Sequence, residues 1–84
     1  MYIVYVLKSQ IQQWHYVGHT KNLTQRLKAH NAGKVRSTKA YRPFTVIYKE
    51  TYPDKSTAFK REQYYKSGAG NQVLREKLMA QGVW

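Results

Sequence analysis

The sequence predicts an α/β protein of the α+β type, with a three-stranded, largely antiparallel sheet flanked by helices in the order β-β-α-β-α-α. Two strand-like segments rich in Tyr and Val precede the first helix signal, and a third follows it. Each helix signal begins at a residue type that commonly caps helices. At 84 residues, the chain is short enough to fold around one core, so we expect one domain over residues 1–84.

The first expected strand covers residues 2–8, and its nearly unbroken apolar run is typical of a strand that is buried on both faces. A polar turn at 9–13 and a second strand at 14–18, ended by Gly18, complete a hairpin. Alternation assigns the side chains of the first strand to two faces, with Ile3, Tyr5 and Leu7 on one and Tyr2, Val4 and Val6 on the other.

The middle of the chain predicts a helix, a basic loop and the third strand. Asn22 is a good N-cap for a helix over 23–30, and Gly33 can adopt the left-handed conformation that ends it. The loop at 34–42 carries four Lys and Arg residues. A strand at 44–48 follows.

The last third predicts two helices. Asp54 or Ser56 can cap a helix that reaches about Lys66. The glycine-containing segment 67–70 breaks that helix, and Asn71 can then cap a final one.

The charge points to a polyanionic partner. Fifteen Lys and Arg residues against four Asp and Glu residues give a formal net charge of +11. A folded domain with this imbalance repels itself, which makes sense if it binds a nucleic acid. A solvated basic surface that serves solubility is the alternative, although acidic surfaces serve that purpose better. No helix combines a basic face with the broad apolar face that membrane binding needs.

Composition excludes several classes of site. The chain has no cysteine, so disulfides, thiolate zinc sites and cysteine nucleophiles are excluded. The histidines His15, His19 and His30 lack a zinc-site spacing. The apolar N-terminus is too short to span a bilayer and lacks a basic leader, so we expect a cytoplasmic protein.

The first helix places two polar residues at the margin of its apolar stripe. Leu23 and Leu27 define the stripe, and Arg26 and His30 share a face beside it. Both side chains are expected to point toward the sheet edge, where they could meet one phosphate. Taken alone, His30 fits a residue favoured by the dipole at a helix C-terminus, and Arg26 fits a solvated cation.

The second helix places a carboxylate inside its apolar arc. Ala58, Phe59 and Tyr65 form the arc, and Glu62 falls within it. Carboxylates are rarely buried unless they are paired or bind a metal. An ion pair with Lys or Arg and a site for one divalent ion are equally compatible with this position, since Mg²⁺ often uses one or two carboxylates plus substrate phosphates.

Two tyrosines in the predicted hairpin can come close across the strands. Tyr5 and Tyr16 lie in adjacent expected strands. Packing is the usual role of a strand tyrosine. A tyrosine with its ordinary pKa of about 10 is a poor base unless cations lower that pKa.

Taken in order, these residues resemble the GIY-YIG nuclease superfamily, and the small bacterial endonuclease-like members in particular. The resemblance covers nearly the whole chain. Ile3 stands where the first motif usually has glycine. The matching segments are Ile3-Val4-Tyr5, Tyr16-Val17-Gly18-His19-Thr20, Asn22-Leu23, Arg26-Leu27, His30-Asn31, Ser37-Thr38, Arg42-Pro43 and Arg61-Glu62.

The resemblance implies metal-dependent hydrolysis of phosphodiester bonds in DNA, with the family's three-stranded sheet. By position, Tyr5, helped by His30, would take a proton from the attacking water, and Tyr16 would orient the phosphate or the water. Arg26 would donate to the phosphate, and Glu62 would hold Mg²⁺ or Mn²⁺. The residues expected to bind the nucleic-acid backbone are Lys34, Arg36, Lys39, Arg42 and Lys66.

Some alternatives stay open at this point. Family members often carry a further polar residue after the glutamate; Asn71 is a weak candidate, because its spacing is short and a helix cap explains it equally well. A non-catalytic nucleic-acid-binding module of the same fold, or an RNA-binding protein of the translation apparatus, would share the charge. RNA as a substrate and the oligomeric state stay undetermined.

Overall fold

The fold has the predicted order of elements. A computed structural model describes all 84 residues, and its three strands form one antiparallel sheet in the order β2-β1-β3. The elements are β1 (Tyr2–Ser9), β2 (His15–Thr20), α1 (Leu23–Asn31), a short 3-10 helix (Lys39–Tyr41), β3 (Phe44–Tyr52), α2 (Lys55–Lys66) and α3 (Gly68–Ala80).

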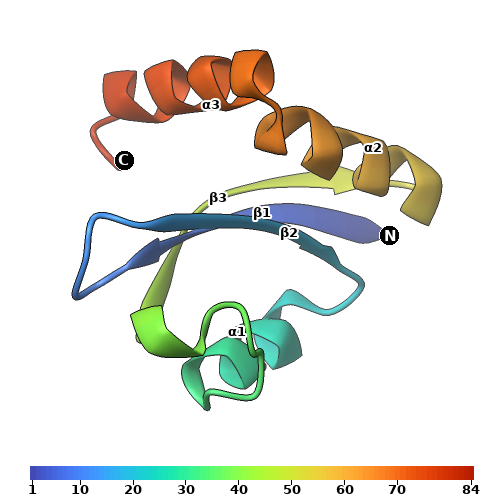
Figure 1. Ribbon diagram of the computed structural model, residues 1–84. Helices are drawn as coiled ribbons and strands as arrows, with labels where there is room; N and C mark the ends of the chain where they lie inside the picture. The colour runs from blue at the N-terminus through green and yellow to red at the C-terminus, as the bar shows by residue number, and fades with distance from the viewer.

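Helices cover both faces of the sheet, α1 on one and α2 with α3 on the other (Figure 1). The two faces of β1 are divided as the alternation predicts. Val4 and Val6 pack in a core with residues of α2 and α3, whereas Tyr5 and Leu7 pack with Phe44 on the α1 side. The central strand is therefore buried on both sides, which explains its continuous apolar run.

Two strands are longer than the sequence indicated. Gly18 does not end β2; it pairs with Tyr5 inside the ladder, and the strand continues to Thr20. β3 continues beyond residue 48 to Tyr52, which pairs with Tyr2. Pairing along the whole of β1 extends both neighbours past the points at which local sequence suggested an end.

The predicted helix caps are largely confirmed. The Asn22 side chain accepts a hydrogen bond from the Gln25 N–H at 3.1 Å. Asp54, rather than Ser56, caps α2 by accepting from the Thr57 N–H at 2.7 Å. Gly33 has the expected left-handed conformation, with φ of 76°.

The start of α3 corrects one prediction. Ser67 caps this helix, not Asn71, because the Ser67 hydroxyl accepts from the Gly70 N–H at 3.2 Å. A Cβ on Gly70 would lie 1.8 Å from the Tyr64 carbonyl oxygen, so only glycine permits this close approach to α2. The segment 67–70 thus ends one helix and begins the next without a loop.

Phe59 corrects a second prediction. The buried side of α2 consists of Ala58, Glu62 and Tyr65. Phe59 lies one step round the helix and is 48% exposed, with its ring edge-on to that of His19 at 5.9 Å between centroids. None of the helices is both long and apolar enough to cross a membrane.

Candidate active site

Tyr5 crosses its neighbouring strand over a glycine. Its side chain leaves β1 on the α1 side and passes Gly18, its partner on β2. A Cβ on Gly18 would lie 2.6 Å from the Tyr5 hydroxyl oxygen and 2.9 Å from Cε2 of Tyr16. The missing side chain therefore makes room for the hydroxyl near the β2 edge of the sheet.

A buried chain of hydrogen bonds links Tyr5 to the loop after α1. The Tyr5 hydroxyl lies 2.9 Å from Nε2 of His30, and Nδ1 of His30 lies 2.8 Å from Oγ1 of Thr38. The Thr38 hydroxyl donates to the Val35 carbonyl oxygen at 3.3 Å. Because the Thr38 hydroxyl donates its proton to Val35, its oxygen accepts a hydrogen bond from Nδ1 of His30. We therefore assign the proton of the neutral ring to Nδ1, which leaves Nε2 to accept a hydrogen bond from the Tyr5 hydroxyl.

Burial sets the protonation of this chain. It raises the pKa of the Tyr5 hydroxyl to about 12, against the lowering effect of the Arg26 guanidinium. Burial, assisted by the charge on Arg26, lowers the pKa of His30 to about 4. At neutral pH both groups are uncharged, so the tyrosine holds its proton and the imidazole can accept one.

Arg26 and Tyr16 lie beside this pair. Arg26 is half-buried in α1, one turn before His30. The ring of Tyr16 lies 5.2 Å from that of His30 and 6.4 Å from that of Tyr5, between centroids. The expectation that Arg26 and His30 share a face toward the sheet edge agrees with these positions, although His30 is fully buried.

Glu62 approaches the same edge from the other face of the sheet. It is only 7% exposed, and its Oε1 lies 2.8 Å from Nδ1 of His19 on β2. Its Oε2 lies 3.1 Å from Nζ of Lys66 and accepts a hydrogen bond from Gln63 at 3.2 Å. The carboxylate is therefore paired, as the ion-pair alternative anticipated, and its cationic partner Lys66 is exposed.

Lys66 connects the two halves of the site. Besides its contact with Glu62, its ammonium group lies 5.3 Å from the centre of the Tyr16 ring, on the α1 side of β2. One cluster on the α1 side of the sheet thus contains Tyr5, Tyr16, Arg26 and His30. Glu62 lies on the other side of the edge strand β2, and Lys66 contacts both Glu62 and Tyr16. That all five share one phosphate stays a prediction.

The site offers a divalent ion one carboxylate, that of Glu62. No group of three or more His, Cys, Asp or Glu side chains lies close enough to enclose an ion. One carboxylate suffices for Mg²⁺ when waters and substrate phosphates complete its octahedron. Glu62 fits that pattern, because the exposed Lys66 can move off its Oε2.

The predicted nucleic-acid contacts are all exposed. Lys66 lies on α2, and the other four lie on the connection between α1 and β3. Among the four in this connection, the Arg42 guanidinium donates to the Lys39 carbonyl oxygen at 3.2 Å and lies over Gly33.

Asn71 lies outside the cluster. It is in the first turn of α3, and its side-chain amide donates to the Tyr65 carbonyl oxygen at 3.3 Å. This bond holds the junction between α2 and α3, so the position of Asn71 is explained by structure.

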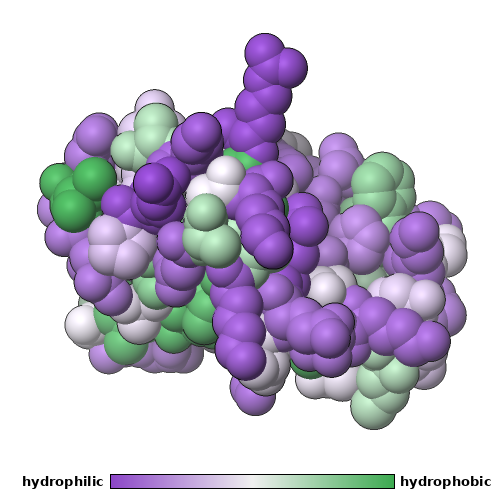
Figure 2. Space-filling view, turned by 90° about the horizontal axis from the view of Figure 1, so that it is seen from below, coloured by the Kyte–Doolittle hydropathy of each residue, from purple (hydrophilic) through white to green (hydrophobic).

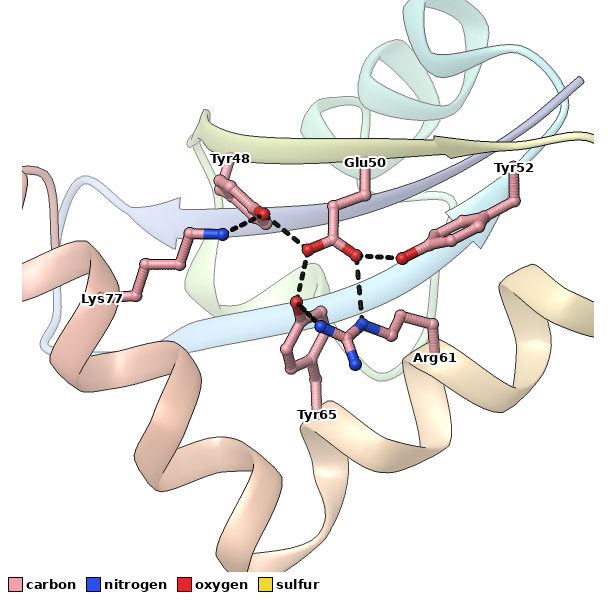
Figure 3. A network of polar contacts seen from close by, with 6 residues as sticks. All are labelled: Tyr48, Glu50, Tyr52, Arg61, Tyr65 and Lys77. Atoms are coloured by element: carbon pink, nitrogen blue, oxygen red, sulfur yellow. Dashed lines mark hydrogen bonds and ion pairs between the residues drawn. The ribbon is translucent and has the colours of Figure 1, made fainter.

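A second polar cluster lies between β3, α2 and α3 (Figure 3). Glu50 accepts hydrogen bonds from the hydroxyls of Tyr48, Tyr52 and Tyr65 and from Arg61. Burial alone would raise the pKa of Glu50, but these four donors together hold it below its usual value. The network fixes α2 against β3.

Sequence reasoning missed two partners in the site and this network. His19 follows Gly18 directly, and alternation along β2 would have placed it on the face that receives α2. The loop before β3 has no repeating pattern that could place Thr38, which was recognised only within the Ser37-Thr38 segment of the family resemblance. The alternate spacing of Tyr48, Glu50 and Tyr52 would have placed them on one face of a strand, but β3 was expected to end at residue 48.

A comparison with protein families matches the part of the chain that carries the candidate site. The model of the GIY-YIG catalytic domain matches residues 1–73, which include Tyr5, Tyr16, Arg26, His30 and Glu62. The chain belongs to the GIY-YIG family. GIY-YIG domains are nuclease-type domains whose characterised members act on DNA and generally use divalent metals.

Its relatives place it in the small bacterial UPF0213 branch of the GIY-YIG family. A UPF0213 protein of Staphylococcus haemolyticus is 37% identical over 73 residues, which are 86% of this chain and 88% of the relative. The UPF0213 protein YazA of Bacillus subtilis is 40% identical over 63 residues, 74% of this chain and 63% of YazA. A solution structure of a UPF0213 protein from Bacillus halodurans shares the fold, with a TM-score of 0.54, 27% identity and coverage of 89% and 82% of the two chains.

Proposed function

We propose that this protein is a divalent-metal-dependent endonuclease that hydrolyses phosphodiester bonds in DNA. The observation that carries the proposal is the buried Tyr5 hydroxyl, directed at a neutral His30 beside Arg26. Gly18 leaves room for this hydroxyl near the β2 edge, and the imidazole behind it offers Nε2 as an acceptor.

Proton transfer follows from the hydrogen-bonded chain. With a pKa of about 12, Tyr5 is not a phenolate at neutral pH. It can still act as a relay: its oxygen takes a proton from the attacking water while its own proton passes to Nε2 of His30. The ring becomes a short-lived imidazolium, held by Thr38 through Nδ1, and returns the proton through the Tyr5 hydroxyl, by which it reaches the leaving oxygen or solvent.

The other residues stabilise the charge that develops on the phosphate. Arg26 gives a charge-assisted donor to a phosphate oxygen, and the Tyr16 hydroxyl orients the phosphate or the water. Glu62 would hold a divalent ion, which would supply positive charge to neutralise the phosphate. The exposed cations Lys34, Arg36, Lys39, Arg42 and Lys66 bind the flanking backbone.

Nicking of supercoiled plasmid tests the proposal, with Mg²⁺ or Mn²⁺ and with chelator. Tyr5→Phe removes only the relaying hydroxyl and should reduce nicking by about 10²–10⁴-fold. Tyr2→Phe is the matched control, because Tyr2 lies on the same strand but faces α2 and α3. Equal nicking by both variants would overturn the assigned role of Tyr5.

A non-catalytic DNA-binding module is the second candidate, favoured by the net charge of +11 and by the paired state of Glu62. The same assay decides between the two. Binding to plasmid without nicking by the wild-type protein, whatever the metal, would establish the binding module.

A further inference from the structure

An open hollow with an apolar floor lies on the α1 side of the sheet. It has a volume of about 560 Å³, and its floor is formed by Ile3, Leu23, Leu27 and Val46. Figure 2 views this side of the molecule and shows apolar side chains set back between protruding hydrophilic ones. Helix α1 has only nine residues, so it leaves this part of the sheet uncovered.

The floor exposes apolar side chains next to charged ones. All four of its side chains are half-buried, so each exposes apolar area to water. A flat ligand that lies on the floor would cover this area. Burying it under a ligand would gain about 25 cal/mol for each square ångström.

The rim gives the charge of the ligand. Lys21, Lys28 and Lys49 surround the floor, and no acidic residue lines the hollow. The ligand that matches is therefore an anion with a flat apolar part. A nucleotide has this composition, with a base for the floor and phosphates on either side for the lysines.

A neighbouring hollow connects this one to Arg26, one residue of the candidate active site. A second hollow of about 420 Å³ at the start of α1 is lined by Arg26 and shares Lys21 and Asn22 with the first. A strand whose phosphate meets Arg26 can thus pass Lys21 and reach the apolar floor without leaving the surface.

We propose that this hollow binds an unpaired base of the DNA strand that runs through the candidate site. A base inside a duplex is stacked on both faces and paired at its edge, so it cannot lie on the floor. The inference rests on the proposed function and adds the substrate class, which is DNA with a single-stranded segment beside the bond to be cut.

Binding of labelled single strands, measured in chelator so that no cleavage occurs, tests the hollow. The probes are an oligonucleotide, the same backbone with abasic sites, and a blunt duplex of the same sequence. The wild-type protein should bind the intact strand about tenfold more tightly than the abasic one. Leu27→Asn should abolish this difference, provided that its thermal melt shows a folded protein.

Two lysine variants keep the test independent of the fold of Leu27→Asn. Lys49→Gln is an exposed change at the rim and should reduce the log–log salt slope for single strands by about 0.7. Lys55→Gln is the matched control, because Lys55 is exposed at the start of α2, on the other face of the sheet; its slope should equal that of the wild type.

The outcomes separate this inference from the proposed function. Equal affinity for intact and abasic strands, or equal slopes for the Lys49→Gln and wild-type proteins, would overturn the hollow as a base site. Plasmid nicking by the wild-type protein in Mg²⁺ reports the nuclease activity separately. Nicking without a base preference overturns only the hollow, and a base preference without nicking overturns only the proposed activity.

Discussion

Glu50 and Glu62 are two largely buried carboxylates with different surroundings. Glu50 lies on β3 and faces α2, whereas Glu62 belongs to α2 and faces β2. Glu50 is enclosed by three tyrosine hydroxyls and Arg61. Glu62 has one imidazole, one neighbouring amide and one exposed lysine. The comparison indicates that the number and mobility of the partners, more than burial, separate a structural carboxylate from one that is free to bind a ligand.

The two carboxylates are coupled through the helix itself. Arg61, which binds Glu50, directly precedes Glu62 in α2. Successive helical side chains diverge by about 100°, so the arginine faces β3 while the glutamate faces His19 on β2. The Glu50 network thereby fixes the rotation of α2 that directs Glu62 toward the site.

The largest expected effect is on catalysis. Glu62→Gln should reduce plasmid nicking by about 10³-fold while DNA binding persists. Its stability should be unchanged or slightly raised, because the amide oxygen can still accept a hydrogen bond from His19 and only the exposed Lys66 loses its counter-charge. Thermal melts, DNA affinity and nicking should be compared with the wild type. Unfolding of Glu62→Gln would make Glu62 a structural residue like Glu50, and undiminished nicking would remove it from the mechanism.

The next effect is on stability. Glu50→Gln removes the counter-charge of Arg61 and the charge-assisted bonds from the tyrosines, so unfolding should become easier by about 2–3 kcal/mol. Chemical denaturation measures this. Glu76→Gln, an exposed change on α3, is the control and should stay within about 0.5 kcal/mol of the wild type. An equally small effect at Glu50 would contradict its structural role.

Lowering the pH should reduce the stability of the protein in two stages, the first through His30 and the second through Glu50. His30 has a folded pKa of about 4, below its usual 6.5, so the unfolded chain takes up the proton first. Stability is then full above pH 6.5 and falls toward about pH 4, by about 1.4 kcal/mol for each unit of pKa difference. The pKa of Glu50 lies below its usual 4.5. Glu50 therefore adds a further loss of stability only below pH 4.5.

Denaturation at a series of pH values resolves these two stages. His30→Gln should flatten the stage between pH 6.5 and 4, and Glu50→Gln the one below 4.5. His15, whose pKa burial also lowers, contributes to the first stage and is measured by His15→Gln. A wild-type protein equally stable at pH 7 and pH 4.5 would contradict the buried neutral state of His30.

The smallest effect concerns the partner of Glu62. Groups that hydrogen-bond a metal ligand typically affect metal affinity by about 10–100-fold. His19→Gln should weaken Mn²⁺ binding by about tenfold, which is the low end of that range. Electron paramagnetic resonance on the protein without DNA measures this affinity. His15→Gln serves as control, because His15 stacks on Trp84. Unchanged Mn²⁺ affinity would show that His19 does not orient the carboxylate.

Local signals predicted much of the fold. The N-caps at Asn22 and Asp54, the left-handed Gly33 and the two faces of β1 depend on interactions within a few residues, and all are confirmed. The ends of β2 and β3 depend on pairing with a distant strand. The start of α3 depends on how tightly it packs on α2. The local sequence pattern therefore could not predict the strand ends or the start of α3.

The candidate site was predictable where it has a helical or strand period. The burial of Glu62 followed from the period of α2. Its contact with His19, the bond from His30 to Thr38 and the Glu50 network join segments distant in sequence. Periodicity within one element carries no information about such partners, and only the resemblance to a family connected Tyr5 to Glu62.

The central place of β1 has a consequence for synthesis of the chain. The strand made first is the one that needs two neighbours, and its second neighbour, β3, emerges about 40 residues later. A nascent hairpin of β1 and β2 therefore presents an unpaired apolar edge until residues 44–52 leave the ribosome. Such edges associate readily with other chains, so the interval before β3 docks is the stage at which this small protein is most exposed to misassembly.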